Sequence, residues 1–332
     1  MRNLLTDIAG ISVGHATDMA MGTGATAILF DEAAVASGVI LGGAPGSRDT
    51  ALLEPEMTQQ RVSGFVLSGG SLFGLDAAGG VQAWLRENKR GIEMRGLYLP
   101  IVPQAILFDL LNGGDKDWGR FSPYTQLGFD AAAAATHGDF ALGTVGAGTG
   151  ATTSTLKGGI GSASARMAEG YTVAAIVAVN AVGTATIGDG PHFWAAPFEQ
   201  GGEFGGRGMP AHVTAHDLAP RLKGLPPPAT ATTIGLVVTD AALSKAQAKR
   251  LAIMANDGLA RAIFPAHAPS DGDTVFAAAT GAVPLADEMH LTLIGHVATQ
   301  VFARAIARGV YEATALPYPP GVPSWKDRFG GA

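Results

Sequence analysis

The sequence predicts an α+β protein built as an αββα sandwich, in which two stacked β-sheets lie between outer layers of helices. The chain begins with short strands, continues into long apolar helices and then alternates strand, helix, strand and helix. Apolar helices need a sheet to cover, and helices with one apolar face are typical of an outer layer. With 332 residues, 47% of them hydrophobic and 15% charged, the chain can form one large or two fused domains.

Strands and two helices are expected in the N-terminal half. Ser71 is placed to cap a helix whose apolar positions, from Leu72 to Leu85, recur at helical spacing. This helix is expected to be buried because it is apolar on nearly all sides. A second helix is expected at 128–136. The runs rich in strand-forming residues are 11–30, interpreted as two strands around a Gly-rich turn, 35–44 and 62–68.

The C-terminal half contains the strongest patterns. Ser244 is expected to cap an amphipathic helix over 241–263, whose apolar residues fall at three- and four-residue spacing. A Gly- and Pro-rich stretch, 188–230, has little periodicity, and its end, LKGLPPPATA, is expected to be exposed and flexible. The other expected elements are strands at 171–187, 232–239 and 274–280 and a final helix over 287–313.

Composition excludes several classes of function. The formal net charge is −6 and Lys and Arg form no run, so nucleic acid is not an expected partner. The chain has no Cys, which excludes disulfides, thiolate catalysis and Cys-based zinc sites. We find neither a signal-peptide pattern nor an apolar run of about 18 residues. A cytoplasmic protein without membrane contact, cofactor or metal is therefore expected.

Three motifs invite functional interpretations that their surroundings do not support. His212 and His216 have the spacing of metal ligands, but no adjacent acid completes a zinc motif, so they are interpreted as loop histidines. The tract 146–150 (GAGTG) lacks the third Gly spacing of the dinucleotide-binding motif and the Lys-Ser/Thr of a P-loop. Backbone packing is therefore the favoured interpretation. Ser71 resembles a nucleophile elbow but misses its second Gly by one position, so a capping role is at least as well supported.

Thr232 stands where the Pro-rich segment meets a buried strand, in the sequence PATATTI. If its hydroxyl attacks the carbonyl of Ala231, an ester forms and hydrolyses, and Thr232 becomes a new N-terminus. A free α-amino group has an ordinary pKa of about 7.7–8.0, which suits it to act as base for the hydroxyl of the same residue. The alternative is a strand that simply begins with β-branched residues.

Three polar residues are candidates to assist Thr232. Asp271 and Asp273 follow the next helix, and carboxylates two residues apart in an extended chain point to the same side. They could hold the α-ammonium and hydroxyl of Thr232, or belong to a polar turn. Asn180 interrupts an apolar run, where a buried amide needs partners. It could donate a hydrogen bond to an oxyanion or mark the turn at a strand end.

Many motifs follow one another along nearly the whole chain. They include TDIAGISVGHAT, GGAPGSRDTALLEP, LSGGSLFGLDAAGGVQAWL, VGAGTGAT, KGGIGSAS, VAVNAVG, TTIGLVVTDAALSKAQAKRLA and DGDTVFAAAT. In these motifs the chain resembles the DmpA-type aminopeptidase family, the group of L-aminopeptidase/D-esterases, β-peptidyl aminopeptidases and nylon-oligomer hydrolases.

This resemblance implies a single αββα domain over 1–332, of the N-terminal-nucleophile-like type shared with ornithine acetyltransferase. It also implies self-cleavage between Ala231 and Thr232, which gives a large piece, 1–231, and a small piece, 232–332. The site residues implied by motif position are Thr232 as the nucleophile, Asn180 as the oxyanion-stabilising residue, and Asp271 and Asp273 as the acidic pair of the Thr-type members.

The expected function is hydrolysis of small peptide or amide bonds through an acyl-Thr232 intermediate, by a homo-oligomer that is a tetramer of processed protomers. The alternatives are acyl transfer on the same scaffold and an unprocessed, catalytically silent binding protein. Two departures from the relatives bear on this choice. Ala231 stands where many Thr-type relatives have Asn, and the Lys that often follows GAGTGAT falls nearest Thr155, two residues before Lys157, which leaves the role of Lys157 open.

Overall fold

The computed structural model describes residues 1–224, 231–319 and 321–330. Its strands are β1 (Ile11–Asp18), β2 (Thr23–Ile40), β3 (Ser47–Arg48), β4 (Arg61–Ser68), β5 (Ile92–Met94), β6 (Leu97–Leu99), β7 (Gln104–Ile106), β8 (Ile160–Arg166), β9 (Thr172–Asn180), β10 (Thr232–Ala241) and β11 (Thr274–Val283). Its helices are α1 (Ser71–Gly74), α2 (Ala77–Glu87), α3 (Tyr124–Ala133), α4 (Lys245–Ala260), α5 (Glu288–Tyr311) and α6 (Trp325–Phe329), with short 3-10 turns η1 (Leu5–Asp7), η2 (Ala51–Leu53), η3 (Gly146–Gly148) and η4 (Ala196–Phe198).

One long strand, β2, carries the chain from one layer of the sheet to the other. Nine strands are hydrogen-bonded in the order β3-β7-β4-β2-β11-β10-β9-β8, with β1 also paired to β2, while β5 and β6 form a separate hairpin. Residues 23–30 of β2 pair with β1, residues 35–40 pair with β11, and β4 pairs with β2 at 25–29 and again at 34–35. Its register with β4 shifts between Leu29 and Ala34, where the interrupted pairing allows the strand to bend. The sheet can therefore fold over on itself without losing continuity.

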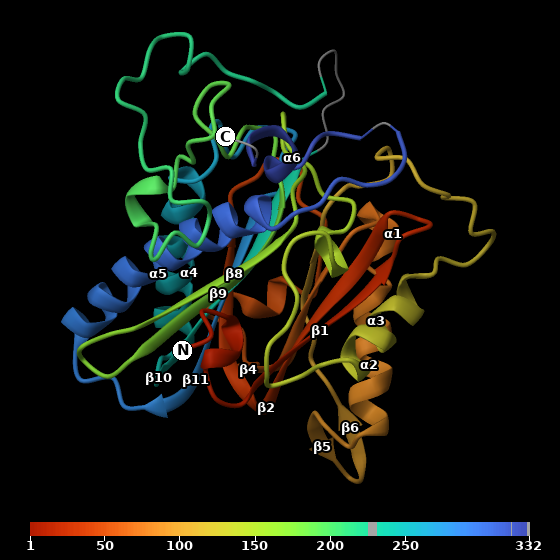
Figure 1. The fold of residues 1–332 in the computed structure, drawn as a ribbon. Helices are drawn as coiled ribbons and strands as arrows, with labels where there is room; N and C mark the ends of the chain where they lie inside the picture. The colour runs from red at the N-terminus through yellow and green to blue at the C-terminus, as the bar shows by residue number, and fades with distance from the viewer. Residues whose placement is uncertain (225–230, 320, 331–332) are drawn as a thin grey trace.

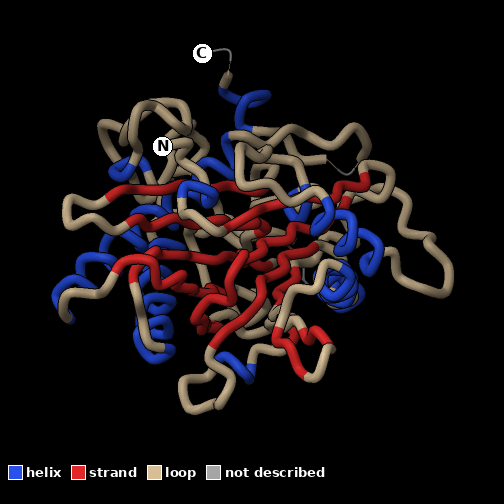
Figure 2. Tube along the Cα trace, turned by 90° about the horizontal axis from the view of Figure 1, so that it is seen from below, coloured by secondary structure: helices blue, strands red, loops and turns tan. Residues whose placement is uncertain are grey.

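Side chains alternate between two cores along the central strands. In β10, Ile234, Leu236 and Val238 face the core between the two halves of the sheet, whereas Val237 faces α4 and α5. On the opposite side, α2 and α3 cover β1, β4 and the first half of β2 in a third core that contains Val66. Figure 1 shows the two helix pairs on opposite sides of the strands, and Figure 2 shows the strands between them. This order confirms the predicted αββα architecture.

Local signals in the sequence placed several elements correctly. The Ser244 Oγ accepts a hydrogen bond from the backbone N–H of Gln247 at 3.3 Å, and the Gln247 Oε1 accepts one from the backbone N–H of Ser244 at 2.8 Å. This reciprocal cap confirms the role predicted for Ser244, although α4 begins at Lys245 rather than at 241, where β10 ends. The strands expected at 62–68 and 232–239 and the final helix are also confirmed. No helix in the described ranges is long and apolar enough to cross a membrane.

Two predictions about the N-terminal half are wrong. The separate strand expected at 35–44 does not exist, because β2 continues without interruption to Ile40 and a loop follows. Ser71 is not a helix cap: Gly70 holds that position with a φ of 85°, which glycine adopts readily. The expected buried helix is instead divided into α1 and α2, and Leu72 and Phe73 are 69% and 52% exposed.

Other differences concern short or irregular segments. The strands β3, β5, β6 and β7 were not expected, because two or three residues are too few to show alternation. The stretch 188–224 is irregular, as predicted, and contains only the short turn η4. Of the segment expected to be flexible, residues 225–230 lie outside the described residues.

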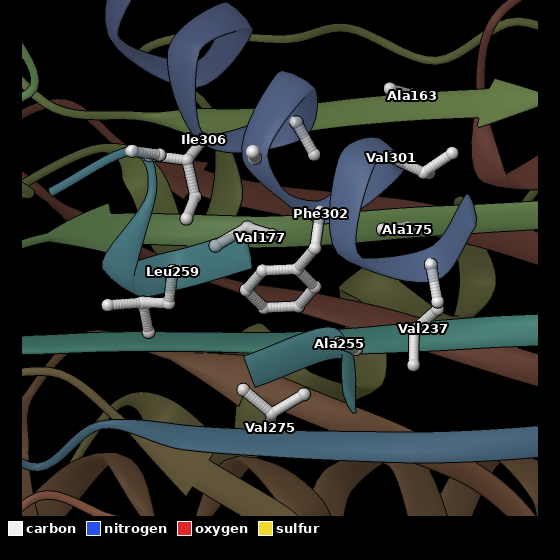
Figure 3. Close-up of a cluster of buried hydrophobic side chains, with 14 of the residues drawn as sticks. Ala163, Ala175, Val177, Val237, Ala255, Leu259, Val275, Val301, Phe302 and Ile306 are labelled. Carbon is white, nitrogen blue, oxygen red and sulfur yellow. The ribbon is translucent and has the colours of Figure 1, made fainter. Parts of the chain in front are cut away.

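Phe302 of α5 occupies the centre of the core beneath α4 and α5 (Figure 3). Its ring is fully buried and lies near Val177, Val237 and Leu259. Gly235 of β10 leaves room for this ring, since a Cβ at that position would come within 2.8 Å of the Phe302 Cζ. Helix and strand therefore fit closely, and a smaller side chain at 302 would leave a cavity.

A Phe302→Ala variant is expected to lower the free energy of unfolding by about 3–5 kcal/mol, through lost apolar burial and the cavity left behind. Urea unfolding followed by tryptophan fluorescence measures this loss. Ile253→Ala is the matched control, because Ile253 lies on α4 and is 37% exposed. Equal effects of the two substitutions would contradict the central role of Phe302.

Candidate active site

Thr232 is the first residue of β10 and is paired with Asn180, the last residue of β9. The side chain of Thr232 is buried, with the residue 4% exposed. Its hydroxyl donates a hydrogen bond to the carbonyl oxygen of the preceding residue, Ala231. The nucleophile candidate and the peptide bond that it would attack are thus in direct contact.

The carbonyl of Ala231 has a second hydrogen-bond donor. The backbone N–H of Gly272 donates to the Ala231 oxygen at 3.0 Å, and Ala231 forms a parallel bridge with Asp271. A Cβ at position 272 would lie 2.7 Å from the Thr232 Oγ1, so only glycine leaves space for the hydroxyl. A backbone N–H aimed at a carbonyl oxygen is the kind of donor that stabilises the negative charge of a tetrahedral intermediate.

Asp273 anchors the start of β10. One oxygen of its buried carboxylate accepts a hydrogen bond from the backbone N–H of Thr233 at 2.7 Å. The other accepts one from the backbone N–H of His267 at 3.0 Å and lies 2.9 Å from the His267 Nδ1. The Nε2 of the same ring contacts the Asn256 amide nitrogen at 3.0 Å. Asp273 therefore holds the residue after Thr232, and His267 bridges Asp273 to α4.

Asp271 is buried beside Asp273 and is less well satisfied. Its Oδ2 accepts a long hydrogen bond from the backbone N–H of Ala268 at 3.4 Å, and its Oδ1 has no partner among the described residues. Burial, followed by the nearby Asp273 carboxylate, raises the pKa of Asp271 to about 7. A carboxyl group that exchanges its proton near neutral pH can serve as a general acid or base.

The buried Asn180 amide is held on both sides. Its Oδ1 accepts hydrogen bonds from the backbone N–H of Thr152 at 3.0 Å and from the Lys223 Nζ at 2.6 Å. Its Nδ2 donates to the backbone oxygen of Phe108 at 3.0 Å. Since an amide nitrogen carries two hydrogens, the second N–H of Asn180 is not used by these contacts and can donate to another group.

A cavity of about 360 Å³ opens beside Asn180. Its walls include Phe108, Leu111, Thr152 and Lys223. This volume is within the range of small-molecule sites, and the lining combines apolar surface with a few polar groups. Asn180 therefore connects the cavity with the buried start of β10.

Lys157 has a different environment from the one a catalytic lysine would need. Its ammonium donates to the backbone oxygens of Gly148, Ala151 and Gly158 at 3.0, 2.7 and 2.7 Å. These three bonds use all three donors of the group. Burial, followed by the charge of Lys223, lowers the pKa of Lys157 to about 7. Lys157 thus ties the Gly-rich tract to the start of β8.

The interpretation of the Gly-rich tract as backbone packing is confirmed. A Cβ at Gly148 would lie 2.3 Å from the backbone nitrogen of Ile160, so the tract packs directly on β8. His212 and His216 lie in exposed loop segments, as interpreted from the sequence. The Nε2 of His216 lies 3.3 Å from the Asp189 carboxylate. Within the described ranges, no three His, Cys, Asp or Glu side chains are grouped as metal ligands.

Comparison with known proteins places this chain in a family. The sequence profile of peptidase family S58 matches residues 3–321. An uncharacterized aminopeptidase of Mycobacterium tuberculosis (strain H37Rv) is 42% identical, with 99% of each chain covered. The chain belongs to peptidase family S58. Membership confirms the resemblance to the aminopeptidases and makes this S58 peptidase a hydrolase of peptide or amide bonds.

More distant similarities include an amide-oligomer hydrolase found by sequence and two aminopeptidases found by fold. A 6-aminohexanoate-oligomer endohydrolase of Kocuria sp. is 27% identical, over 90% of this chain and 84% of that protein. A β-aminopeptidase of Burkholderia sp. superimposes with a TM-score of 0.72 at 22% identity, over 99% of this chain and 92% of that chain. The L-aminopeptidase D-Ala-esterase/amidase of Ochrobactrum anthropi, described as a variant of the Ntn hydrolase fold, gives a TM-score of 0.72 at 20% identity, with 97% and 91% covered.

Three groups near the 231–232 bond in this S58 peptidase were not found by sequence reasoning. The Gly272 N–H is a backbone donor, and a backbone donor leaves no mark in a sequence. His267 offered a signal, because it lies four residues before Asp271, in the same loop. Lys223 offered none, since it lies in an irregular Gly- and Pro-rich stretch.

Proposed function

We propose that this S58 peptidase cuts its own chain between Ala231 and Thr232 and then uses Thr232 as an N-terminal nucleophile against small peptide or amide substrates. The observation that carries this proposal is the environment of one carbonyl group. The Thr232 hydroxyl contacts the Ala231 oxygen, and the Gly272 N–H donates to the same oxygen at 3.0 Å. A nucleophile and an oxyanion donor thus meet at a single peptide bond.

The self-cleavage consists of an acyl shift followed by hydrolysis. The Thr232 Oγ1 loses its proton and attacks the carbonyl carbon of Ala231, and the Gly272 N–H stabilises the resulting oxyanion. The C–N bond then breaks, the nitrogen takes up a proton, and an ester joins Ala231 to the Thr232 oxygen. Water hydrolyses this ester, which leaves a carboxylate on Ala231 and a free α-amino group on Thr232.

Cleavage supplies a partner to a carboxylate oxygen of Asp271 that has none among the described residues of the uncut chain. Asp271 is 1% exposed and its Oδ1 has no partner among the described residues. Asp271 also forms the bridge with Ala231, so the new α-ammonium of Thr232 would arise close to it. A cation beside a buried carboxylate favours the ionised form of the carboxylate. We therefore assign Asp271 and Asp273 to orienting the mature N-terminus.

Hydrolysis by the mature enzyme reuses these groups. The α-amino group of Thr232 takes the hydroxyl proton as Oγ1 attacks the substrate carbonyl, with the remaining N–H of Asn180 directed to the oxyanion. The amine part of the substrate leaves with that proton, and an acyl-Thr232 ester remains. Water then releases the acid. The cavity of about 360 Å³ beside Asn180 and the aminopeptidase and amide-oligomer hydrolase names of the relatives support a small substrate with an accessible amino end.

Intact-mass spectrometry of the purified protein tests this proposal. The expected result is a pair of fragments with the masses of residues 1–231 and 232–332, together with hydrolysis that increases in proportion to the cleaved fraction. An uncut chain that hydrolyses amides at the same rate would overturn the N-terminal mechanism. An uncut chain without activity would favour the silent binding protein.

The same preparation separates hydrolysis from acyl transfer. Adding a second amine to the reaction should leave the yield of free acid nearly unchanged if water resolves the acyl-enzyme. A new amide formed at the expense of the acid would favour the acyltransferase. The tetramer of processed protomers and the cytoplasmic location stay predictions, which native mass measurement and cell fractionation test.

A further inference from the structure

Lys223 brings a positive charge into the cavity from a segment that shows no regular structure. Its backbone N–H donates to the oxygen of Val182 at 2.9 Å, which fixes the segment next to the end of β9. Its ammonium donates to the Asn180 Oδ1 at 2.6 Å and to the Thr152 oxygen at 3.2 Å. Lys157, the other lysine nearby, has all its donors on backbone oxygens. Lys223 is thus the lysine that contacts Asn180, the candidate for stabilising the oxyanion.

This contact fixes the orientation of the Asn180 amide. The Oδ1 accepts from two donors, the Thr152 N–H and the Lys223 ammonium, while Nδ2 faces the oxygen of Phe108. A flipped amide would place N–H groups against both donors and an oxygen against the Phe108 oxygen. Such a flip breaks three buried hydrogen bonds, each of which is costly to leave unmade.

The ammonium also changes the strength of the amide as a donor. A cation at the carbonyl oxygen of an amide draws electron density from its nitrogen, so the N–H becomes more acidic and donates a stronger hydrogen bond. Hydrogen bonds to ionised groups are stronger than neutral ones, and linked bonds polarise one another. The N–H of Asn180 that is not bound to Phe108 benefits directly.

We propose that Lys223 is a positioning residue that orients and polarises the Asn180 amide, so that its remaining N–H stabilises the oxyanion formed when Thr232 attacks a substrate. This inference rests on the proposed function of Thr232. It assigns to Lys223 an effect on the rate of the acyl step rather than on substrate binding.

The charge of Lys223 depends on pH near neutrality. Burial lowers the pKa of Lys223 to about 7, while Asp271 and Asp109 act in the opposite direction. Lys157 lies close enough for the two lysine charges to repel each other. As pH rises through about 7, the ammonium loses its proton and the polarisation of Asn180 disappears. The Thr232 amine must be deprotonated to act as a base, so the fraction of active amine increases as pH rises, whereas the charged fraction of Lys223 decreases.

Three variants test the proposal: K223M, K223R and the control K89M, in which an exposed lysine is replaced. Rates are divided by the amount of new Thr232 N-terminus measured by mass spectrometry, so that slow maturation does not count as slow catalysis. K223M is expected to lower kcat about 10- to 100-fold, less than the full loss of an oxyanion donor, with KM changed by no more than about twofold. K89M should match the wild type.

The pH profile of kcat gives the readout that a merely structural lysine would not change. K223M should lack the fall in kcat that the wild type shows as Lys223 deprotonates, because it has no charge to lose. K223R keeps its charge at all these pH values, so its fall should be absent or move to higher pH while part of the rate is retained. If circular dichroism shows that K223M is unfolded, the pH profile of K223R still tests the proposal by itself.

The outcomes distinguish this inference from the function on which it rests. A processed K223M enzyme with the kcat and pH profile of the wild type would overturn the role of Lys223 alone. A change in KM without a change in kcat would also overturn it, because Lys223 would then act in substrate binding. A wild-type chain that stays uncut yet hydrolyses amides would instead remove the proposed function itself.

Discussion

A Thr232→Ala variant is expected to remain a single chain of 332 residues and to lose hydrolytic activity. The Thr232 hydroxyl is the group that contacts the Ala231 carbonyl, and alanine has no atom to replace it. Without it neither the ester within the chain nor the acyl-enzyme can form. The loss of kcat should therefore be about 10⁴-fold or more, as for other enzymes that lose their nucleophile.

Two companion variants make the result specific. Thr232→Ser keeps a hydroxyl and should still mature and hydrolyse substrate. Thr233→Val removes the neighbouring hydroxyl, which is buried without a partner among the described residues, and keeps the shape of the side chain. Intact mass and hydrolysis rate are measured for all three. Self-cleavage by Thr232→Ala, or inactivity of Thr233→Val equal to that of Thr232→Ala, would rule out the assignment of Thr232 as the nucleophile.

An Asp271→Asn variant is expected to slow both self-cleavage and hydrolysis by about 10²–10⁴-fold. The substitution keeps the shape of the carboxyl group but removes the charge that orients the Thr232 α-ammonium, together with the proton that Asp271, with its pKa raised to about 7, exchanges near neutrality. The rate at which fragments appear in freshly synthesised chain measures the first effect, and kcat measures the second. The control is Asp257→Asn, on the exposed side of α4. Normal rates for Asp271→Asn would exclude Asp271 both from orienting Thr232 and from the proton transfers.

The same substitution should change how stability depends on pH. Burial raises the pKa of Asp271 from 3.8 to about 7, so between these values the folded chain keeps a proton that the unfolded chain has lost. The contribution of Asp271 to the unfolding free energy therefore falls as pH rises through this window and is constant above it. Asp271→Asn removes this fall. We compare the double variant Thr232→Ala/Asp271→Asn with the uncut Thr232→Ala chain. The unfolding free energy of the double variant should increase relative to that of Thr232→Ala from pH 4 to about 7, as measured by the midpoints of urea unfolding.

The candidate site could be predicted in part because its side chains mark short sequence patterns. Thr232 begins a strongly apolar strand, Asn180 interrupts another, and Asp271 and Asp273 stand two residues apart before a third. All four lie around the 231–232 peptide bond or the ends of the strands beside it. Their individual roles were not visible, since Asp273 holds the backbone of Thr233 whereas Asp271 lacks a partner for one oxygen among the described residues.

The sequence by itself determined what depends on residues two to four positions apart. The strand-forming runs of β9, β10 and β11 and the reciprocal cap at Ser244 are signals of this kind. The order of the layers was predicted from the order of these elements and from the sheet that apolar and one-faced helices need to cover. The tertiary structure decided what depends on contacts far apart in the chain. The strand β2 passes between layers because it pairs with β4 in one layer and with β11 in the other. The Gly272 N–H meets the Ala231 oxygen only after β10 and β11 pair. Lys223 contacts Asn180 although the two residues are 43 positions apart in the sequence. Local propensity cannot encode such contacts, because long-range packing sets which segments meet.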